Sequence, residues 1–277
     1  MEKRVSQKNY KPYFYIWGFL AAFAIMFTLN FILPIKNIIL INHFSDITGR
    51  ATNWCYLLLC ILASYYILKI RKFKLLDLIV GIVLGYIGWY VGYNGYISSI
   101  TVFACYYSAC QIFRKYKQEN KYFDIGIRKF LKSLLFGIVL AIPFAIINDV
   151  AMNIMSGSGF KSFSFGSIIP SALHAVPPGA TEEIIFRFFL IAFATYVFGG
   201  NIPKDKFTVF SVYILCIVPH NLIHYPAVFL NSPIMGIAVA LFTALLFGIP
   251  MTWLVRNKNL QTSMAFHWFI DFVRFIF

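Results

Sequence analysis

Residues 130–148 read FLKSLLFGIVLAIPFAIIN, a run with one charged side chain, Lys132. A helix needs about 20 apolar residues to cross the hydrocarbon core of a bilayer, so this run predicts a membrane-spanning helix. Searching outward for similar runs gives nine expected spans, at residues 13–35, 52–70, 75–91, 96–113, 130–148, 179–198, 207–224, 234–255 and 260–277. The third and fourth runs are separated only by the turn 92–96, so they could also form one broken segment. The count is therefore eight or nine.

The composition supports the same fold class. Hydrophobic residues make up 60% of the 277 residues and charged residues 12%, against roughly a quarter charged in an average soluble domain. This excludes a soluble enzyme, a disordered chain and a secreted disulfide scaffold. The first apolar run is too long for a cleaved signal peptide and is expected to remain as an anchor. We predict an all-α, polytopic transmembrane helical bundle with about 8–9 transmembrane helices.

The net charge of +14 is explained by the topology of the chain, because cytoplasmic loops of membrane proteins are enriched in Lys and Arg. With the N-terminus in the cytoplasm, one side of nine spans holds 19 cations: Lys3, Arg4, Lys8, Lys11, Lys69, Arg71, Lys72, Lys74, Arg114, Lys115, Lys117, Lys121, Arg128, Lys129, Lys132, Lys204, Lys206, Arg256 and Lys258. The other side holds only Lys36, Arg50, Lys161 and Arg274. We therefore expect an integral protein of the cell membrane with a cytoplasmic N-terminus and no nucleic-acid partner.

Ionisable residues within the apolar runs are concentrated near the C-terminus. A charged side chain inside a span costs a few kcal/mol on insertion scales, so each one calls for a reason. The first five spans contain almost none, whereas the last four contain Glu182, Glu183, Arg187, His220, His224, His267 and Asp271. This contrast predicts an N-terminal transmembrane scaffold over residues 1–129 and a catalytic membrane domain over residues 130–277.

The first cluster is TEEIIFR at residues 181–187. Pro177, Pro178 and Gly179 precede it, so both carboxylates are expected in the first turns of a helix, where the helix dipole favours negative charge. Glu183 and Arg187 are four residues apart and share a face, so they can form an ion pair. Glu182 is rotated about 100° away and lacks that partner. It therefore suits a general base acting on water, although an acidic helix start with one buried salt bridge would explain the pattern equally well.

Two further pairs have the same spacing of four residues, namely His220 with His224 and His267 with Asp271. Such spacing places two side chains on one helix face, as metal ligands or a base and its partner require. Hydrogen-bonded core histidines and a buried His–Asp contact are the alternatives. The helix directions put all three clusters in the same half of the bilayer, which indicates one water-filled pocket able to hydrolyse a bond.

These motifs resemble those of a known family. Glu-Glu-x-x-x-Arg, then a helix ending in His, then His-x-x-x-Asp or Asn near the C-terminus is the pattern of the CAAX protease and bacteriocin-processing (CPBP, or Abi) intramembrane proteases, a group that includes the Ras-converting CAAX endopeptidases. The resemblance covers residues 130–277. It implies that Glu182 activates water with help from His224, that Glu183 and Arg187 are supporting residues, and that His267 and Asp271 act as ligands or oxyanion stabilisers.

The resemblance leaves the use of a metal open, since both a metalloprotease and a metal-free glutamate mechanism have been argued for this family. If Zn²⁺ is used, its ligands are expected to be Glu182, His224 and His267. Two positions depart from the usual motifs. His220 replaces a Phe, and we favour a polar packing role for it over a fourth ligand. Asp271 stands where Asn is common, and an ionised Asp cannot donate a hydrogen bond to an oxyanion, which favours a metal.

The sequence therefore predicts an intramembrane endopeptidase that cleaves a hydrophobic or lipidated peptide, either CAAX-like or a bacteriocin or leader peptide, within the lipid bilayer. Cleavage of a prenylated CAAX peptide needs a cytosolic opening, whereas the cation pattern puts the pocket in the outer half, so these two expectations conflict. A catalytically silent relative acting as a membrane interaction or bacteriocin-immunity protein is the main alternative. An ion-coupled transporter is less favoured because no internal repeat is visible.

Overall fold

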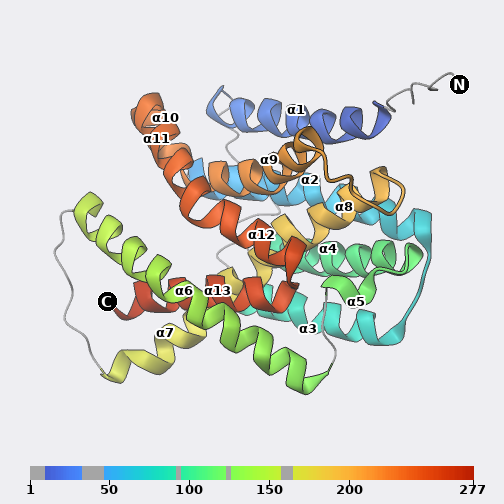
Figure 1. The fold of residues 1–277 in the computed structure, drawn as a ribbon. Helices are drawn as coiled ribbons and strands as arrows, with labels where there is room; N and C mark the ends of the chain where they lie inside the picture. The colour runs from blue at the N-terminus through green and yellow to red at the C-terminus, as the bar shows by residue number, and fades with distance from the viewer. Residues whose placement is uncertain (1–9, 33–46, 92–94, 123–125, 157–164) are drawn as a thin grey trace, which may run out of the picture.

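The structure is a computed structural model that describes residues 10–32, 47–91, 95–122, 126–156 and 165–277. Lys3, Arg4, Lys8, Lys36 and Lys161, counted above, lie outside the described residues, as do residues 92–94 of the expected turn. Within the described ranges the chain forms helices and turns, with no strand (Figure 1). The prediction of an all-α fold is confirmed.

The predicted apolar runs fall largely within helices, and further short helices occur between them. The first part contains α1 (Lys11–Ile32), α2 (Ile47–Ile70), α3 (Leu75–Val91), α4 (Gly95–Lys115), α5 (Glu119–Tyr122) and α6 (Ile127–Ser156). The second part contains η1 (Phe165–Ser167), α7 (Ile168–His174), η2 (Pro178–Glu182), η3 (Ile184–Phe189), α8 (Leu190–Val197), α9 (Lys206–His224), α10 (Pro226–Asn231), α11 (Pro233–Thr243), η4 (Ala244–Gly248), α12 (Ile249–Asn257) and α13 (Leu260–Ile276). Of the four η elements, η1 is a 3₁₀-helix and the other three are π-helical.

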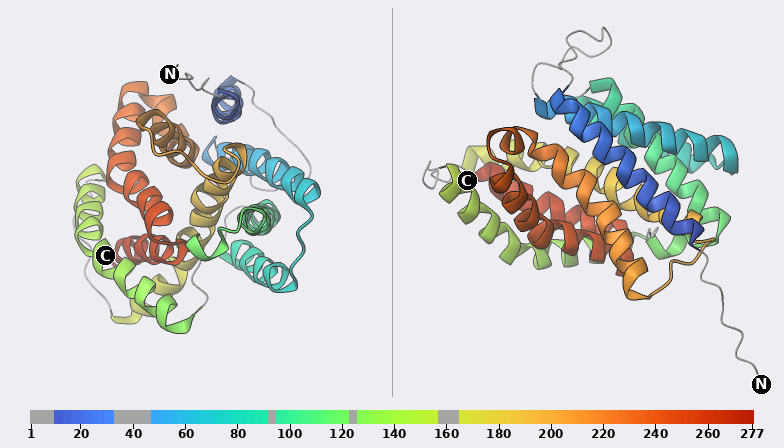
Figure 2. Two further views of the ribbon diagram at one scale, coloured as in Figure 1. Left: turned by 45° about the vertical axis from the view of Figure 1, so that its right-hand side comes forward. Right: turned by 90° about the horizontal axis from the view of Figure 1, so that it is seen from above.

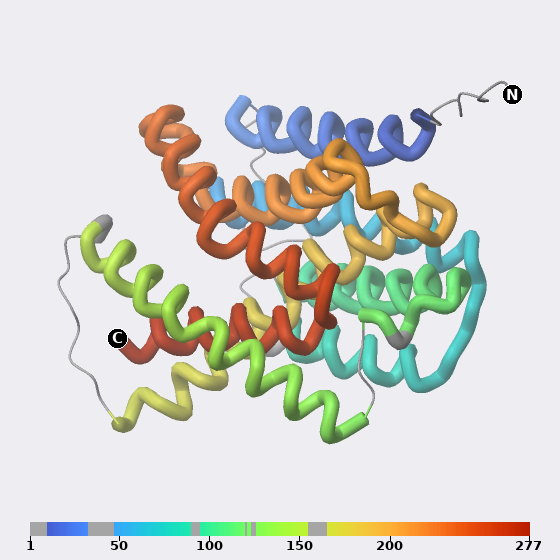
Figure 3. The backbone as a smooth tube through the Cα atoms, viewed as in Figure 1, coloured from blue at the N-terminus to red at the C-terminus, as the bar shows by residue number. Residues whose placement is uncertain are grey.

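Five helical segments in the described part of the chain are long and apolar enough to cross a membrane. They are Lys11–Ile32, Ile47–Ile70, Ile127–Ile154, Lys206–His224 and Pro233–Asn257. The last of these joins α11, η4 and α12 into one continuous helical path (Figure 3). The predicted count of eight or nine spans is not confirmed. Two of the other expected spans, α3 and α13, are 17 residues long, and the run 179–198 is divided between π- and α-helical pieces.

The centre of the bundle is formed by η3 and α8. The residues from Ile184 to Thr195 are all buried, as expected for a helix that is hydrophobic on every side. The left-hand view in Figure 2 shows this segment surrounded by other helices. Across the proposed division at residue 129, α4 packs against η3 and α1 against α9, so the two parts form one bundle. The division itself stays a prediction.

Many described cations lie at one end of the bundle, here called the cationic end. Lys11 begins α1, Lys69 and Lys115 lie in the last turns of α2 and α4, Arg128 lies near the start of α6, and Lys206 begins α9. In Figure 1 the ends of α1, α2 and α4 lie at the right-hand side, whereas the start of α6 lies lower and that of α9 nearer the middle. This arrangement agrees with the expectation that the cations of alternate loops lie on one side of the membrane. Which side of the membrane this end faces stays a prediction.

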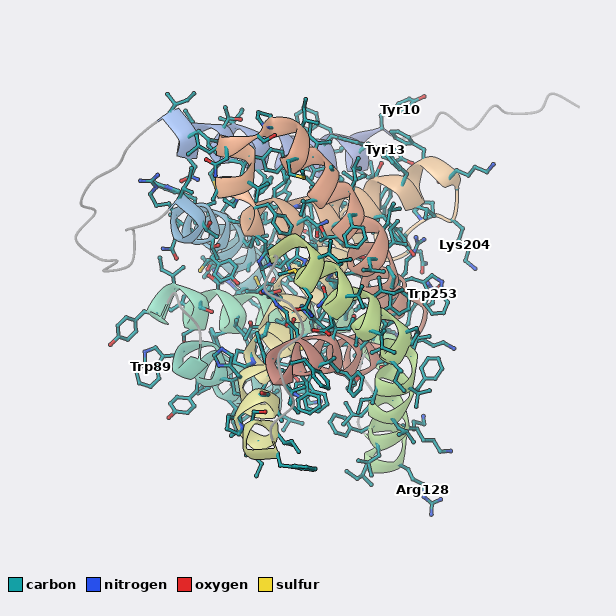
Figure 4. All side chains as sticks on the ribbon, turned by 90° about the vertical axis from the view of Figure 1, so that its left-hand side faces the viewer. Tyr10, Tyr13, Trp89, Arg128, Lys204 and Trp253 are labelled. Atoms are coloured by element: carbon teal, nitrogen blue, oxygen red, sulfur yellow. The ribbon has the colours of Figure 1, made fainter. Side chains whose placement is uncertain are left out.

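The outer surface is covered by apolar and aromatic side chains. Tyr10, Trp89 and Trp253 project outward from the ribbon in Figure 4, and they are 69%, 42% and 43% exposed. An exposed apolar belt of this kind is unfavourable in water and suits contact with lipid.

Capping side chains fix where the two helices that carry the histidines begin. The carboxylate of Asp205 accepts hydrogen bonds from the backbone N–H and the hydroxyl of Thr208 at the start of α9. These bonds hold the pKa of Asp205 below its ordinary value, because they stabilise the charged form. The side chain of Asn259 accepts from the backbone N–H of Thr262 in the same way at the start of α13.

Candidate active site

The two adjacent glutamates lie where the backbone adopts π-helical geometry. η2 ends at Glu182 and η3 follows Glu183, and in both elements the backbone hydrogen bonds connect residues five apart. Pro178 at the start of η2 has no backbone N–H to donate. The Thr181 hydroxyl donates to the Pro177 carbonyl at 2.6 Å. Turns of this kind occur frequently at functional sites.

Gly179 allows η2 to lie directly against α13. A Cβ atom at this position would be 2.9 Å from Trp268 Cα, closer than real Cβ contacts. The Trp268 indole N–H donates to the Ala172 carbonyl in α7, which fixes α13 against the turn before η2. The close approach brings both glutamates to the face of α13 that carries His267.

Glu182 is surrounded by imidazoles from α9 and α13. Its Oε2 atom lies 2.6 Å from His220 Nε2, 3.7 Å from His224 Nε2 and 3.8 Å from His267 Nε2. Among the described residues, no lysine or arginine forms an ion pair with Glu182. His220, for which a packing role was favoured, thus makes the shortest contact with this carboxylate.

Glu183 has a different set of partners. Its Oε1 atom lies 3.0 Å from both Arg187 and His267 Nδ1, and its Oε2 atom accepts a hydrogen bond of 2.5 Å from the Ser263 hydroxyl. The predicted ion pair with Arg187 is present, and both side chains are fully buried. The guanidinium is paired by charge and is not aligned for a regular hydrogen bond. Glu183 therefore holds the orientation of His267.

Ser263 was not identified from the sequence. It lies one turn before His267 on the same face of α13, and Asp271 lies one turn after His267. The Ser263 hydroxyl also contacts the Met251 carbonyl at 3.1 Å. The spacing of four residues between Ser263, His267 and Asp271 was the only available signal. A serine on an apolar helix is too common for that signal to be specific.

Asp271 lies at the edge of the cluster. Its Oδ2 atom is 3.4 Å from His267 Nε2, a charge contact that is longer than a normal hydrogen bond. The orienting contact to His267 is made by Glu183 at the other ring nitrogen. The His267 imidazole is therefore oriented by Glu183 and not by Asp271.

The hydrogen-bond partners also indicate the tautomers of two histidines. An ionised Glu183 can only accept, so the hydrogen of a neutral His267 lies on Nδ1, and Nε2 presents a lone pair to Glu182. His220 shows the opposite pattern. Its Nε2 atom donates to Glu182, while its buried Nδ1 atom has no hydrogen-bond partner among the described residues. An N–H at that Nδ1 atom would be buried without an acceptor, which is costly.

The cluster has donor atoms that suit a metal ion. One ligand atom each from Glu182, His220 and His224 lies within 4.8 Å of the others. Imidazole and carboxylate are ligands that zinc uses in catalytic sites. His220 fits this role poorly, because ligation through Nε2 would place the hydrogen on the unpartnered Nδ1 atom. His267 fits it better, since metal-bound histidines usually donate their other N–H to a carboxylate.

The site is reached from the side of His224. The His224 side chain is 42% exposed, whereas that of Glu182 is 14% exposed. His224 also ends α9, so it lies at the boundary between the bundle interior and the surface. Water would therefore arrive at Glu182 past His224.

All seven predicted site residues, Glu182, Glu183, Arg187, His220, His224, His267 and Asp271, thus lie in one cluster, and this cluster lies within the segment that matches a known family. The family model for Type II CAAX prenyl endopeptidase Rce1-like proteins matches residues 164–273. Residues 164–273 are thus similar to this CAAX protease family. No curated protein and no solved structure matches the chain.

The matched segment includes η2, α9 and most of α13, the three elements that supply most of the cluster. The helices α1 to α6 lie outside the match. The family match supports protease activity, and together with the five apolar helices it makes this an integral membrane protein.

Proposed function

We propose that the protein is an intramembrane endopeptidase in which Glu182 is the general base that activates water. The observation that carries this proposal is the environment of Glu182. Its carboxylate lies within 3.8 Å of three imidazoles and has no ion pair with a lysine or arginine among the described residues. A carboxylate held in this way is available to take a proton, unlike Glu183, which is fixed by Arg187 and Ser263.

In the proposed reaction, a water molecule binds between Glu182 and His224, at the exposed edge of the cluster. Glu182 takes one proton from this water as the oxygen attacks the carbonyl carbon of a peptide bond. His267 acts here in its protonated form, with hydrogens on both Nδ1 and Nε2. Its Nε2–H donates to the resulting oxyanion, and Asp271, 3.4 Å from the same nitrogen, stabilises the positive charge of the ring. When the C–N bond breaks, Glu182 returns its proton to the leaving amine.

A zinc ion is compatible with this cluster. Glu182, His224 and His267 would hold it, with Glu183 as the partner of His267. A bound zinc ion supplies Lewis acidity that activates water and stabilises negative charge on oxygen. The roles of Glu183, Arg187 and Ser263 in orienting His267 are the same with or without the ion.

The substrate we propose is a hydrophobic or lipidated peptide that reaches the cluster from the bilayer. The family name refers to prenylated CAAX peptides, and the apolar surface of the helices suits a substrate that partitions into lipid. The opening at His224 would admit the scissile bond to the cluster.

The test compares wild type, Glu182→Gln and Glu119→Gln in lipid nanodiscs. Each protein is incubated with prenylated and unprenylated CAAX peptides and with hydrophobic leader peptides, and the products are identified by mass spectrometry. Wild type and Glu119→Gln, which alters an exposed carboxylate on α5, are expected to cleave equally. Glu182→Gln is expected to lose at least about 10²-fold in rate, the lower range for a general base.

Two outcomes would contradict parts of the proposal. Equal cleavage by wild type and Glu182→Gln would exclude Glu182 as the base. No cleavage of any peptide by the wild type would favour the alternative of a catalytically silent membrane interaction or bacteriocin-immunity protein. A parallel assay after chelation, with the metal content measured, separates the two mechanisms. Full activity without metal would exclude the zinc version, and recovery on adding Zn²⁺ would support it.

A further inference from the structure

A groove lies on the lipid-facing side of α1 and α2, away from the glutamates and histidines of the site. Its volume is about 820 Å³, and α8 forms its floor. The walls are mostly apolar, with Phe19, Leu58, Leu62 and Phe193 among the lining residues. Gly18 lies on the α1 wall, and a Cβ atom there would meet no other atom within 4 Å, so the groove is open at this point.

One end of the groove is cationic. Lys11 and Lys69 line it at the cationic end of the bundle, and no carboxylate is among the described lining residues. The Lys69 ammonium donates to the Tyr65 hydroxyl at 2.6 Å and lies 5.5 Å from the centre of the Tyr196 ring. The Lys115 ammonium lies 4.7 Å from the centre of the same Tyr196 ring. The groove thus ends at lysine side chains that contact tyrosine rings and hydroxyl groups. These hydroxyl groups can also form hydrogen bonds with a ligand.

The length of the groove matches one leaflet. On α1 it runs from Lys11 to Ala22, and on α2 from Lys69 to Leu58. At 1.5 Å per residue, either path is about 16 Å long. Half of a hydrocarbon core of about 30 Å is about 15 Å. A chain lying in the groove with a polar group at the lysines would therefore extend from the membrane surface to the bilayer centre.

We propose that this groove binds one anionic phospholipid of the surrounding leaflet. The phosphate contacts Lys69 and Lys11, with the tyrosine hydroxyls as further donors, and one acyl chain lies along Gly18 and Ala22 between α1 and α2. A zwitterionic lipid has the same chains but lacks the net negative charge that complements this end of the groove. The proposal does not depend on protease activity.

The test measures lipid retention by native mass spectrometry of the purified full-length protein, which is independent of peptide cleavage. The protein is equilibrated with phosphatidylglycerol or phosphatidylcholine having the same acyl chains. Wild type is expected to retain one phosphatidylglycerol in preference to phosphatidylcholine. Lys69→Gln is expected to bind phosphatidylglycerol about fivefold more weakly, since a lysine near a membrane surface contributes about 1 kcal/mol. Lys129→Gln removes an exposed lysine of α6 outside the groove and should have no effect.

A second pair of variants tests the position of the acyl chain. Gly18→Leu fills the groove without a clash at Cβ and is expected to abolish retention, whereas Gly18→Ala leaves most of the space and should retain the lipid. Equal loss in Lys69→Gln and Lys129→Gln would show a general charge effect and overturn the proposal. Retention by Gly18→Leu, equal retention of phosphatidylcholine, or displacement by inorganic phosphate alone would each overturn it as well.

Discussion

At the scale of single residues, two neighbouring glutamates are given opposite properties by their partners. Glu183 is fully buried and has three partners, one of them a counter-ion, whereas the partners of Glu182 among the described residues are imidazoles. The pairing of Glu183 with Arg187 could be predicted from the sequence, because it depends only on helical spacing. The contact of Ser263 with Glu183 could not, because it joins residues 80 positions apart. Only the fold determines that the serine of α13 faces the site.

The buried ion pair predicts a strong effect of removing one partner. Arg187→Leu leaves the Glu183 carboxylate in the interior without its counter-ion, which costs about 3–5 kcal/mol for buried pairs. We expect a large fall in the thermal unfolding temperature in detergent. The double variant with Glu183→Leu removes both charges and should unfold at a higher temperature than Arg187→Leu alone. If the double variant is the less stable protein, the charge of Glu183 is not what destabilises the single variant.

The hydroxyl of Ser263 is expected to matter for both stability and rate. Ser263→Ala removes a hydrogen bond to a buried charge, worth about 1.5–3 kcal/mol, and loosens the residue that orients His267. We expect a lower unfolding temperature and roughly 10-fold slower peptide cleavage, partly restored by Ser263→Thr. Ser211→Ala is the matched control, because Ser211 is also a buried serine but bonds only within its own helix. Equal effects of the two alanine variants would argue against a positioning role.

At the scale of elements, the sequence predicts where helices occur better than how their backbones are bonded. The boundaries of α3 and α9 agree closely with the predicted runs, since hydropathy and length determine them. The π-helical bonding of η2 and η3 leaves no trace in hydropathy, because it changes the hydrogen-bond register without changing composition. The short helices α7 and α10 were not predicted for a related reason. Each is too short to produce a run of its own.

The contact between η2 and α13 predicts the effect of adding one methyl group. Alanine is favoured over glycine in helices by about 1 kcal/mol, so Gly179→Ala would be stabilising if nothing opposed it. Here the added Cβ would lie 2.9 Å from Trp268 Cα and push η2 away from α13. We expect lower stability and at least about 10-fold lower cleavage activity. Gly18→Ala, where the added atom meets open space, should leave both quantities unchanged. Identical behaviour of the two variants would contradict the close contact.

At the scale of the whole molecule, the charge pattern predicts an arrangement that the structure supports only in part. The cations at the ends of α1, α2 and α4 do lie at one end of the bundle (Figure 1). The number of crossings could not be derived from apolar runs, because a helix at the bundle centre is as apolar as one facing lipid. The segment η3–α8 shows this, since its burial comes from protein neighbours on all sides.

The orientation in the membrane can be tested by labelling. Lys121→Cys introduces a thiol in α5 near the cationic end, and Asn231→Cys introduces one at the end of α10, at the opposite end of the bundle. With a cytoplasmic N-terminus, a membrane-impermeant maleimide should modify Asn231→Cys in intact cells and Lys121→Cys only after the cells are opened. The reverse pattern would place the cationic end outside. It would also remove the conflict between a cytosolic CAAX substrate and a pocket in the outer half.

The π-helical turns have a consequence for how activity can be lost. A helix whose backbone bonds span five residues returns to regular α-helix when one residue is removed. Such a deletion after the glutamates, within residues 184–189, would leave an apolar segment still able to pack at the bundle centre. It would nevertheless turn the two carboxylates by about 100° relative to the rest of the helix, away from α9 and α13. The loss of a single codon would then produce a folded, silent protein that keeps every one of its proposed catalytic side chains.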